Sequence, residues 1–326
     1  MMTQVQTAQQ PPQSGVTAEL YTQVEEYLSL GSLTTEEQEN QTPKKKRKVI
    51  KRKSARTTET TQEQEDEESE SLSSERLAVK INGKTVRGSA YEIVSRMVEA
   101  EMGATFQPEA LKAQAVAAYS YVRFHNQAGT TPSVAAKNNP STAVKEAVKE
   151  VLGEAIYYDG KVINATYSAS NAGQSMDSEH VWGNALPYLV SVESPGDTTL
   201  RAYGATKTFS EEEIAEKISD ELGIDPYEFG SPEEWFSNPE YINGQYVDTI
   251  EVCGEIVSGR KVREELLDFQ INSAAFEVEY DGQFIFTTYG YGHGVGLSQQ
   301  GADYYAMQGW NYEEILTHYY TDTTVQ

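Results

Sequence analysis

Residues Tyr91–Val122, YEIVSRMVEAEMGATFQPEALKAQAVAAYSYV, predict two helices in close succession. Ser89 precedes the first, whose apolar side chains recur at helical spacing and form one stripe: Ile93, Met97, Val98 and Met102. This helix is expected to end near Gly103. Pro108 suits the first turn of the second helix, whose buried side carries Leu111, Ala115, Ala118 and Val122. So many alanines imply close helix packing.

Elements of both kinds flank this pair. Hairpins are predicted around Asn82-Gly83 and Asp159-Gly160, because Asn-Gly and Asp-Gly favour the tightest hairpin turns. Further helices are expected at 142–152, from Ser210 to Leu222, and at 301–307 and 312–319, with strands at 246–253, 276–280 and 284–288. Residues 168–183 are small and polar and predict a long ordered loop. Early helices and late strands indicate an α+β fold, with N-terminal helices packed against a mixed or antiparallel sheet and irregular loops around a substrate cleft.

Charge divides the 326-residue chain, whose formal net charge is -24. Residues 1–76 hold a basic block at 44–56 and an acidic block at 63–70, which predicts a disordered charged tail. The stretch PKKKRKV, 43–49, reads like a nuclear-import signal and also suits an anionic membrane surface, but such runs are more often solvated, disordered charge blocks. Residues 77–326 hold 16 basic and 36 acidic residues, and this charge of -20 argues against nucleic acid as a partner. Within them, residues 225–245 combine prolines and aromatics and predict an insertion.

The densest glycine motif is GYGHGVGLSQQGA, residues 290–302. Alternate glycines flank His293 and allow the backbone to come close to another surface while the imidazole projects. The spacing does not fit a dinucleotide-binding loop, and a phosphate loop would need a lysine that is absent. The motif therefore predicts either a tight structural turn or the wall of a binding site.

Four segments resemble the stage II sporulation protein D family and its amidase-enhancer relatives, in the same order along the chain. They are the helix pair at 91–122, VWGNALPYLVSVESPGD at 181–197, SGRKVREEL at 258–266, and GYGHGVGLSQQGADYYAMQGWNYEEILTHYY at 290–320. The resemblance extends over most of residues 77–326, which are therefore expected to form the family's catalytic domain.

The resemblance implies a peptidoglycan lytic transglycosylase, which cleaves the bond between N-acetylmuramic acid and N-acetylglucosamine without water and leaves a 1,6-anhydro end. The family's catalytic acid matches Glu101, next to Met102. A partly desolvated carboxyl has a raised pKa, so it can donate a proton near neutral pH and later accept one. Glu99 is two residues away and is expected to point elsewhere on the helix.

Further side chains are candidates for hydrogen bonds to sugar hydroxyl or acetamido groups. They are Lys112 and Gln114 on the second helix, Ser170, Asn171 and Gln174 in the loop, and His293 and Gln299 at the glycine-rich turn. Some family members bind zinc through His and Cys near residues 168–173, but this chain has neither type there, so no metal and no cofactor are expected. Tyr119 stands where many members have an arginine.

The expected partners are glycan strands stripped of their stem peptides, and a cell-wall amidase. An alternative is a non-catalytic wall-binding module that enhances a partner amidase. Glu101 favours the enzyme, whereas Tyr119, in place of the arginine of many members, is compatible with the non-catalytic module. Substrate and family both imply an extracytoplasmic location in the cell envelope, although the N-terminus MMTQVQTAQQPPQSG has no features of a signal peptide and no apolar run adjoins the basic block.

Overall fold

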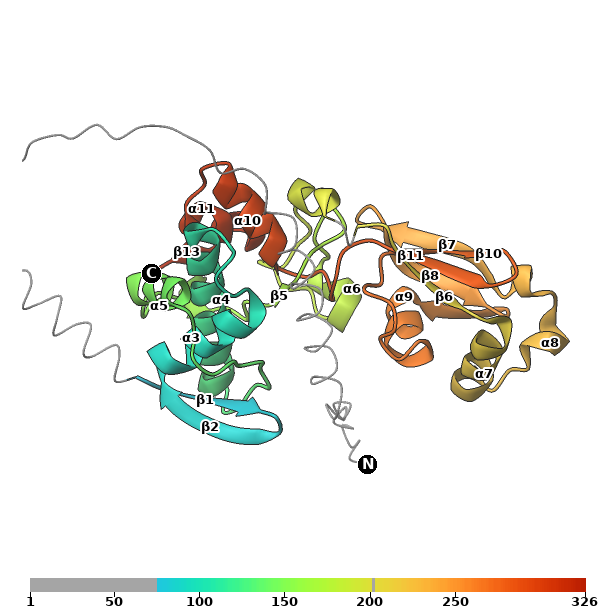
Figure 1. Cartoon of the computed structure of the whole chain (residues 1–326), viewed down its shortest axis with the longest axis horizontal. Helices are drawn as coiled ribbons and strands as arrows, with labels where there is room; N and C mark the ends of the chain where they lie inside the picture. The colour runs from blue at the N-terminus through green and yellow to red at the C-terminus, as the bar shows by residue number, and fades with distance from the viewer. Residues whose placement is uncertain (1–74, 201–202) are drawn as a thin grey trace, which may run out of the picture.

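The predicted helix pair forms the centre of a helical lobe, residues 75–200 and 290–326 (Figure 1). The computed structural model describes residues 75–200 and 203–326. The predicted tail, 1–76, lies outside these residues except for Glu75 and Arg76, and Arg76 is the first residue of strand β1. Helix α3 (Ala90–Glu101) starts at the cap Ser89, whose side chain accepts the N–H of Glu92, and α4 (Pro108–Gln127) follows.

Helix α4 is the axis of this lobe. It packs against α3, α5 (Thr142–Glu150), α10 (Gln299–Met307) and α11 (Tyr312–Tyr319), so among the described residues the first and last helices share one apolar core. The alanines of α4 at 110, 113, 115, 117 and 118 are buried, as the sequence predicted. Small side chains let the neighbouring helices approach closely.

Short strands surround the helices. The antiparallel hairpin β1 (Arg76–Ile81) and β2 (Lys84–Ser89) turns at Asn82-Gly83, as predicted. Strand β3 (Ile156–Tyr158) pairs with β4 (Lys161–Val162) and with β13 (Thr324–Val325) at the end of the chain. Strand β5 (Tyr167–Ser168) runs parallel to β12 (Leu297–Ser298). This last pair brings the predicted loop beside the glycine-rich turn.

A sheet lobe, residues 203–289, has a separate apolar core. One antiparallel sheet has the order β10 (Phe276–Tyr280), β11 (Phe284–Thr288), β6 (Ala205–Phe209), and the other the order β7 (Phe236–Ile242), β8 (Tyr246–Val252), β9 (Glu255–Ser258). Helix α7 (Glu211–Leu222) begins with the predicted capping box of Ser210 and Glu213. The α+β class with antiparallel sheets is thus confirmed.

Irregular and short helical segments complete the chain. Residues 168–183 are irregular apart from the ends of β5 and the one-turn helix α6 (Ser178–Trp182), and the 3-10 helix η2 (Pro195–Thr199) follows. In the sheet lobe, α8 (Pro226–Phe229), the 3-10 helix η3 (Pro232–Glu234) and β7 occupy residues 225–245, and α9 (Gly259–Lys261) continues into a π-helical turn, η4 (Val262–Leu266). Across the described residues, no helix combines the length and apolar character needed to cross a membrane.

The close approach of the glycine-rich turn to a neighbouring backbone segment can be tested by substitution. Gly296 has φ +78°, and a Cβ atom there would overlap the carbonyl group of Thr166. Gly282 has φ +71° but open space around it. We expect Gly282→Ala to lower the free energy of unfolding by about 1 kcal/mol through backbone strain, and Gly296→Ala to lower it by about 3 kcal/mol or more. Urea denaturation of both variants would measure this, and equal losses would contradict the close approach.

Candidate active site

Glu101 is the last residue of α3, at the point where the chain turns towards α4. The N–H groups of Met102 and Gly103 both donate to the carbonyl of Val98, and Gly103 takes a left-handed conformation with φ +69°. Such a left-handed residue ends a helix and redirects the chain. The apolar stripe of α3 therefore anchors the helix in the core, while its final side chain lies at the start of the α3–α4 connection.

Gln299, the first residue of α10, holds the Glu101 carboxyl group. Its Nε2 donates to Oε2 of Glu101 at 2.9 Å, and the Gln299 side chain is only 3% exposed. One turn further along α10, Asp303 accepts the N–H of Gln107 at 2.6 Å. Helix α10 thus fixes both the carboxyl group and the connection that follows it, so two of the predicted site residues, Glu101 and Gln299, are in direct contact.

The surroundings of Glu101 favour its neutral form. Burial raises the pKa of Glu101 to about 7, although the bond from Gln299 acts in the opposite direction. Burial raises the pKa of Tyr121, and the charge of Glu101 raises it further. Tyr121 therefore lies near Glu101. A carboxyl group with a pKa near neutral can both donate and accept a proton at physiological pH.

The neighbouring carboxylate Glu99 has a different role. Its Oε2 accepts both the backbone N–H of Ser141, at 2.9 Å, and the Ser141 hydroxyl, at 2.8 Å, just before α5 begins. As the helical spacing predicted, Glu99 points away from the Glu101–Gln299 pair. The end of α3 therefore supplies one carboxyl group to the site.

Asp197, in η2, is a buried carboxylate that the sequence analysis did not single out. It accepts hydrogen bonds from the hydroxyls of Ser194 and Ser298, at 2.6 and 2.7 Å, and from the backbone N–H of Asn171 at 3.0 Å. The N–H of Gly301 is a fourth donor, and burial still raises the pKa of Asp197 to about 6. Because Ser298 caps α10 and precedes Gln299, Asp197 positions the partner of Glu101.

The predicted loop residues line the same junction. Ser170 pairs through its backbone with Tyr291, and the N–H of Asn171 donates to Asp197. The Ser170 hydroxyl and the Asn171 side-chain amide nitrogen are buried and have no hydrogen-bond partner among the residues that the structure describes. Gln174 is partly exposed and forms a backbone bridge with Glu193. These residues support the glycine-rich turn, and their predicted contacts with sugar stay predictions.

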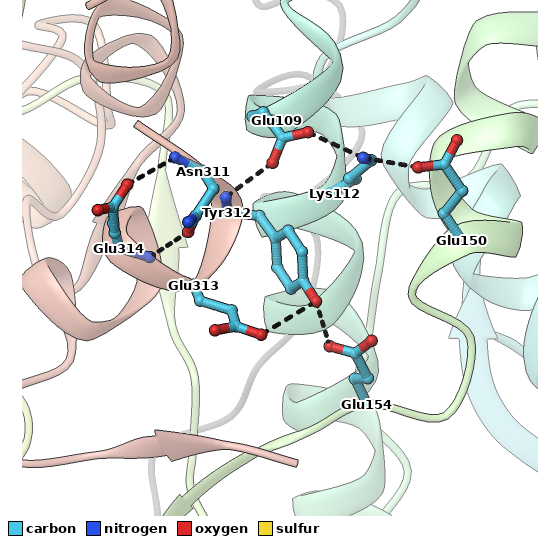
Figure 2. Close-up of polar contacts among 8 residues, drawn as sticks. All are labelled: Glu109, Lys112, Glu150, Glu154, Asn311, Tyr312, Glu313 and Glu314. Carbon is cyan, nitrogen blue, oxygen red and sulfur yellow. Dashed lines mark hydrogen bonds and ion pairs between the residues drawn. The ribbon is translucent and has the colours of Figure 1, made fainter. Parts of the chain in front are cut away.

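Lys112 lies in a polar cluster that joins three helices (Figure 2). Its ammonium group contacts Glu109 of α4 at 2.8 Å and Glu150 of α5 at 2.6 Å. Glu109 also accepts the backbone N–H of Tyr312 at the start of α11. In this arrangement the charge of Lys112 is already neutralised by two carboxylates, and binding sugar would require Lys112 to exchange one of them.

Two further α4 residues are inside the lobe. The Gln114 side chain is fully buried, and within 75–200 and 203–326 neither polar atom of its amide has a hydrogen-bond partner. The Tyr119 hydroxyl donates to Glu75, and the Arg123 guanidinium lies 5.6 Å from the centre of the Tyr119 ring. The residue at the family's arginine position is therefore engaged with Glu75 and Arg123.

His293 lies at the seam between the lobes. Its Nδ1 accepts the N–H of Val295 at 3.0 Å, and its ring is 5.3 Å from the ring of Trp182. Burial lowers the pKa of His293 to about 4, so the imidazole is neutral at pH 7. Within residues 75–200 and 203–326, no three His, Cys, Asp or Glu side chains come together as a set that could hold a metal ion.

Comparisons with known proteins agree with this arrangement. The family model described as "Stage II sporulation protein" matches residues 86–158, which include Glu101. Stage II sporulation protein D of Bacillus subtilis is 33% identical over 261 residues, covering 72% of this chain and 73% of the relative. The same protein of Bacillus amyloliquefaciens is 33% identical over 260 residues, with 70% and 72% covered. An amidase enhancer of Bacillus subtilis is 26% identical over 279 residues, covering 69% of this chain and 39% of the enhancer.

Helices α3 and α10 meet at the Glu101 carboxyl group, in a domain that combines a helical lobe with antiparallel sheets. The chain belongs to the stage II sporulation protein D family. The resemblance found in the sequence is confirmed.

The raised pKa of Glu101 predicts a pH-dependent stability. Its pKa is about 7 in the folded chain against 4.5 as the ordinary value, so folding favours the protonated carboxyl group. This contribution is present below about pH 4.5 and is lost as the pH rises through 7, a change of about 3 kcal/mol. Glu101→Gln should remove it. Comparing the free energies of unfolding of both chains at pH 4 and pH 8 tests this, and parallel profiles would contradict it.

The hydrogen bonds of Asp197 predict that its substitution will lower the stability of the protein. Asn in its place would present an N–H₂ group to donors that now point at a carboxylate, so we expect Asp197→Asn to lower the free energy of unfolding by about 3 kcal/mol. If the variant still folds, the loosened α10 should also alter the pKa of Glu101. NMR titration of ¹³C-labelled glutamate side chains would measure that pKa, with Glu101→Gln identifying the signal. An unchanged pKa would exclude the positioning role.

Proposed function

We propose that this protein is a peptidoglycan lytic transglycosylase with Glu101 as its single general acid and base. The observation that carries the proposal is the desolvated carboxyl group of Glu101, whose pKa is about 7 and whose orientation is held by Gln299. A helix glutamate without a function is normally exposed and has an ordinary pKa. Membership of the stage II sporulation protein D family supports the same role.

The reaction needs two proton transfers through one carboxyl group. The protonated Glu101 donates to the glycosidic oxygen, and the bond from that oxygen to the anomeric carbon of the muramic acid unit breaks. The sugar's own 6-hydroxyl oxygen then bonds to the anomeric carbon, and the Glu101 carboxylate takes the hydroxyl proton. The products are a free 4-hydroxyl group on one strand and a 1,6-anhydro end on the other, and Glu101 is protonated again.

The absence of a water nucleophile explains why one carboxyl group is enough. Hydrolytic glycosidases pair two carboxyl groups, one of which activates water or attacks the sugar. Here the nearest carboxylate in sequence, Glu99, is held by Ser141, and Asp303 accepts a backbone N–H. In the proposed site Gln299 keeps the active oxygen of Glu101 oriented, while Ser170, Asn171, Gln174 and His293 remain candidates for binding the glycan.

The names of the relatives support a cellular process and a location for the proposed reaction. The named relatives are a stage II sporulation protein D and an amidase enhancer, and we infer a role in wall remodelling during sporulation, outside the cytoplasmic membrane. The second name supports a cell-wall amidase as partner, because removal of stem peptides would expose the glycan. It also supports the second candidate function, a wall-binding module that enhances an amidase without cutting glycan.

Cleavage products distinguish the two functions. The full chain should release anhydro-ended fragments, detected by mass spectrometry, from purified peptidoglycan treated with an amidase, and fewer from intact peptidoglycan. Glu101→Gln should reduce this activity by about 10³-fold, because general acid and base catalysis typically contributes 10² to 10⁴. Binding without new ends would favour the enhancing module.

Glu99→Gln is the matched control for this experiment. It makes the same change two residues away, in a carboxylate that caps α5 and lies outside the proposed site. Its activity should stay within about threefold of the wild-type value, since a loosened cap changes stability rather than chemistry. If both variants lost activity equally, the assignment of Glu101 would fail.

A further inference from the structure

A small pocket opens at the seam between the two lobes, beside the glycine-rich turn. Its walls come from the predicted loop (Met176, His180, Val181), from β8 and its neighbours (Tyr246, Val247, Asp248, Ser258, Ala274), from α9 and η4 (Arg260, Arg263, Glu264), and from Gly292 and His293. The pocket has a volume of about 30 Å³. That volume suits two waters or a carboxylate group and is too small for a sugar ring.

Two guanidinium groups share one carboxylate at this pocket. Arg260 donates from Nε to Glu264 at 2.9 Å, and Nη1 of Arg263 lies 3.7 Å from the other oxygen of Glu264. Arg263 is only 5% exposed, and its Nε bond to the carbonyl of Ile271 is long, at 3.4 Å. A buried guanidinium is costly unless it has a close anionic partner. Arg263 therefore has capacity for a second anion.

The lining also holds a second carboxylate, Asp248, and two imidazoles, those of His180 and His293. Asp248 lies 3.5 Å from His180, with which it pairs. His293 is neutral and uses Nδ1 to accept the N–H of Val295. In a domain whose overall charge is strongly negative, this pocket brings two guanidinium groups into one small cavity.

An exposed aromatic ring stands at the rim. Trp182 is 38% exposed and contacts the His293 ring at 5.3 Å. Arg260 donates from Nη1 to the carbonyl of Val181, the residue before Trp182, so the indole and the guanidinium are neighbours. A partly exposed indole face offers a stacking surface for the apolar face of a sugar ring.

A chain of contacts links this rim to the proposed catalytic group. His293 forms a hydrogen bond with the backbone of Tyr167, and the Tyr167 ring lies 6.3 Å from the ring of Tyr121. Tyr121 is in turn within electrostatic reach of Glu101. Tyr167 also pairs with Leu297, two residues before Gln299. The pocket and Glu101 are therefore linked through a short series of packed side chains.

We propose that this pocket is a carboxylate subsite for the glycan strand, in which Arg260 and Arg263 bind a carboxylate of a muramyl unit while Trp182 stacks on its sugar ring. This inference rests on the proposed function, since it takes the same polymer as ligand. The carboxylate has two possible sources: the lactyl group, which is free only after an amidase removes the stem peptide, and the stem peptide itself. Either one would form charge-assisted bonds with the guanidinium groups.

Binding to three glycans tests the subsite. The full chain carrying Glu101→Gln, so that no glycan is cut, is titrated with amidase-stripped glycan, with the same glycan after its lactyl carboxylates are converted to methylamides, and with intact peptidoglycan. We expect at least tenfold tighter binding to the stripped glycan than to the methylamide form. Tighter binding to intact peptidoglycan than to the methylamide form would instead assign the stem-peptide carboxylate. Equal binding to all three would overturn the subsite.

Substitutions then locate the effect. Arg260→Gln, which changes a half-exposed side chain, should remove the preference for a carboxylate and leave binding to the methylamide glycan unchanged, whereas Arg87→Gln, on the exposed hairpin, should change neither. Trp182→Leu should weaken binding to all three glycans equally. A preserved carboxylate preference in Arg260→Gln would overturn the proposal. If binding depends on the carboxylate but the wild-type chain never produces anhydro ends, the proposed subsite stands and the proposed transglycosylase activity is wrong.

Discussion

The site depends on the hydrogen bonds that converge on the buried Asp197. This carboxylate accepts bonds from the loop at Asn171, from Ser194 in its own segment, and from Ser298 and Gly301 at the start of α10. Ser194 also shares a hydrogen bond with the buried Tyr319 of α11. One ionisable group thus holds three segments that have no extended strand pairing between them. Its burial is tolerated because four donors satisfy it.

The two lobes contribute differently to function. The helical lobe supplies Glu101, Gln299 and the helices that shield them, and so it provides the environment in which a carboxyl group stays protonated near pH 7. The sheet lobe supplies Arg260 and Arg263, at the border where its core meets the other. Tyr246 of β8 belongs to the helical lobe's core, and its hydroxyl accepts the N–H of Ala172. The seam is therefore packed and polar at once.

Much of the fold could be predicted because its signals are local. Helical spacing located α3, the Ser-x-x-Glu pattern located the start of α7, and Asn82-Gly83 located the first hairpin. The role proposed for Glu101 came from resemblance to the family, and its contact with Gln299 could not be read from spacing, because 198 residues separate them. Asp197 ends one of the segments that resemble the family, but its burial could not be predicted, since one aspartate in a polar loop is usually exposed. Gln114 and Lys112 illustrate the reverse: residues of types that suit sugar binding are buried or paired.

The wide separation of Glu101 and Gln299 also bears on when the protein can act. During synthesis, α3 and α4 emerge long before α10, so Glu101 is at first surrounded by water and has the acidity of an ordinary glutamate. Contacts between distant parts of a chain form slowly, because a large loop must close first. The protonated acid therefore comes into being only when the last helices dock. A nascent or truncated chain would carry the residue but lack the environment that raises its pKa.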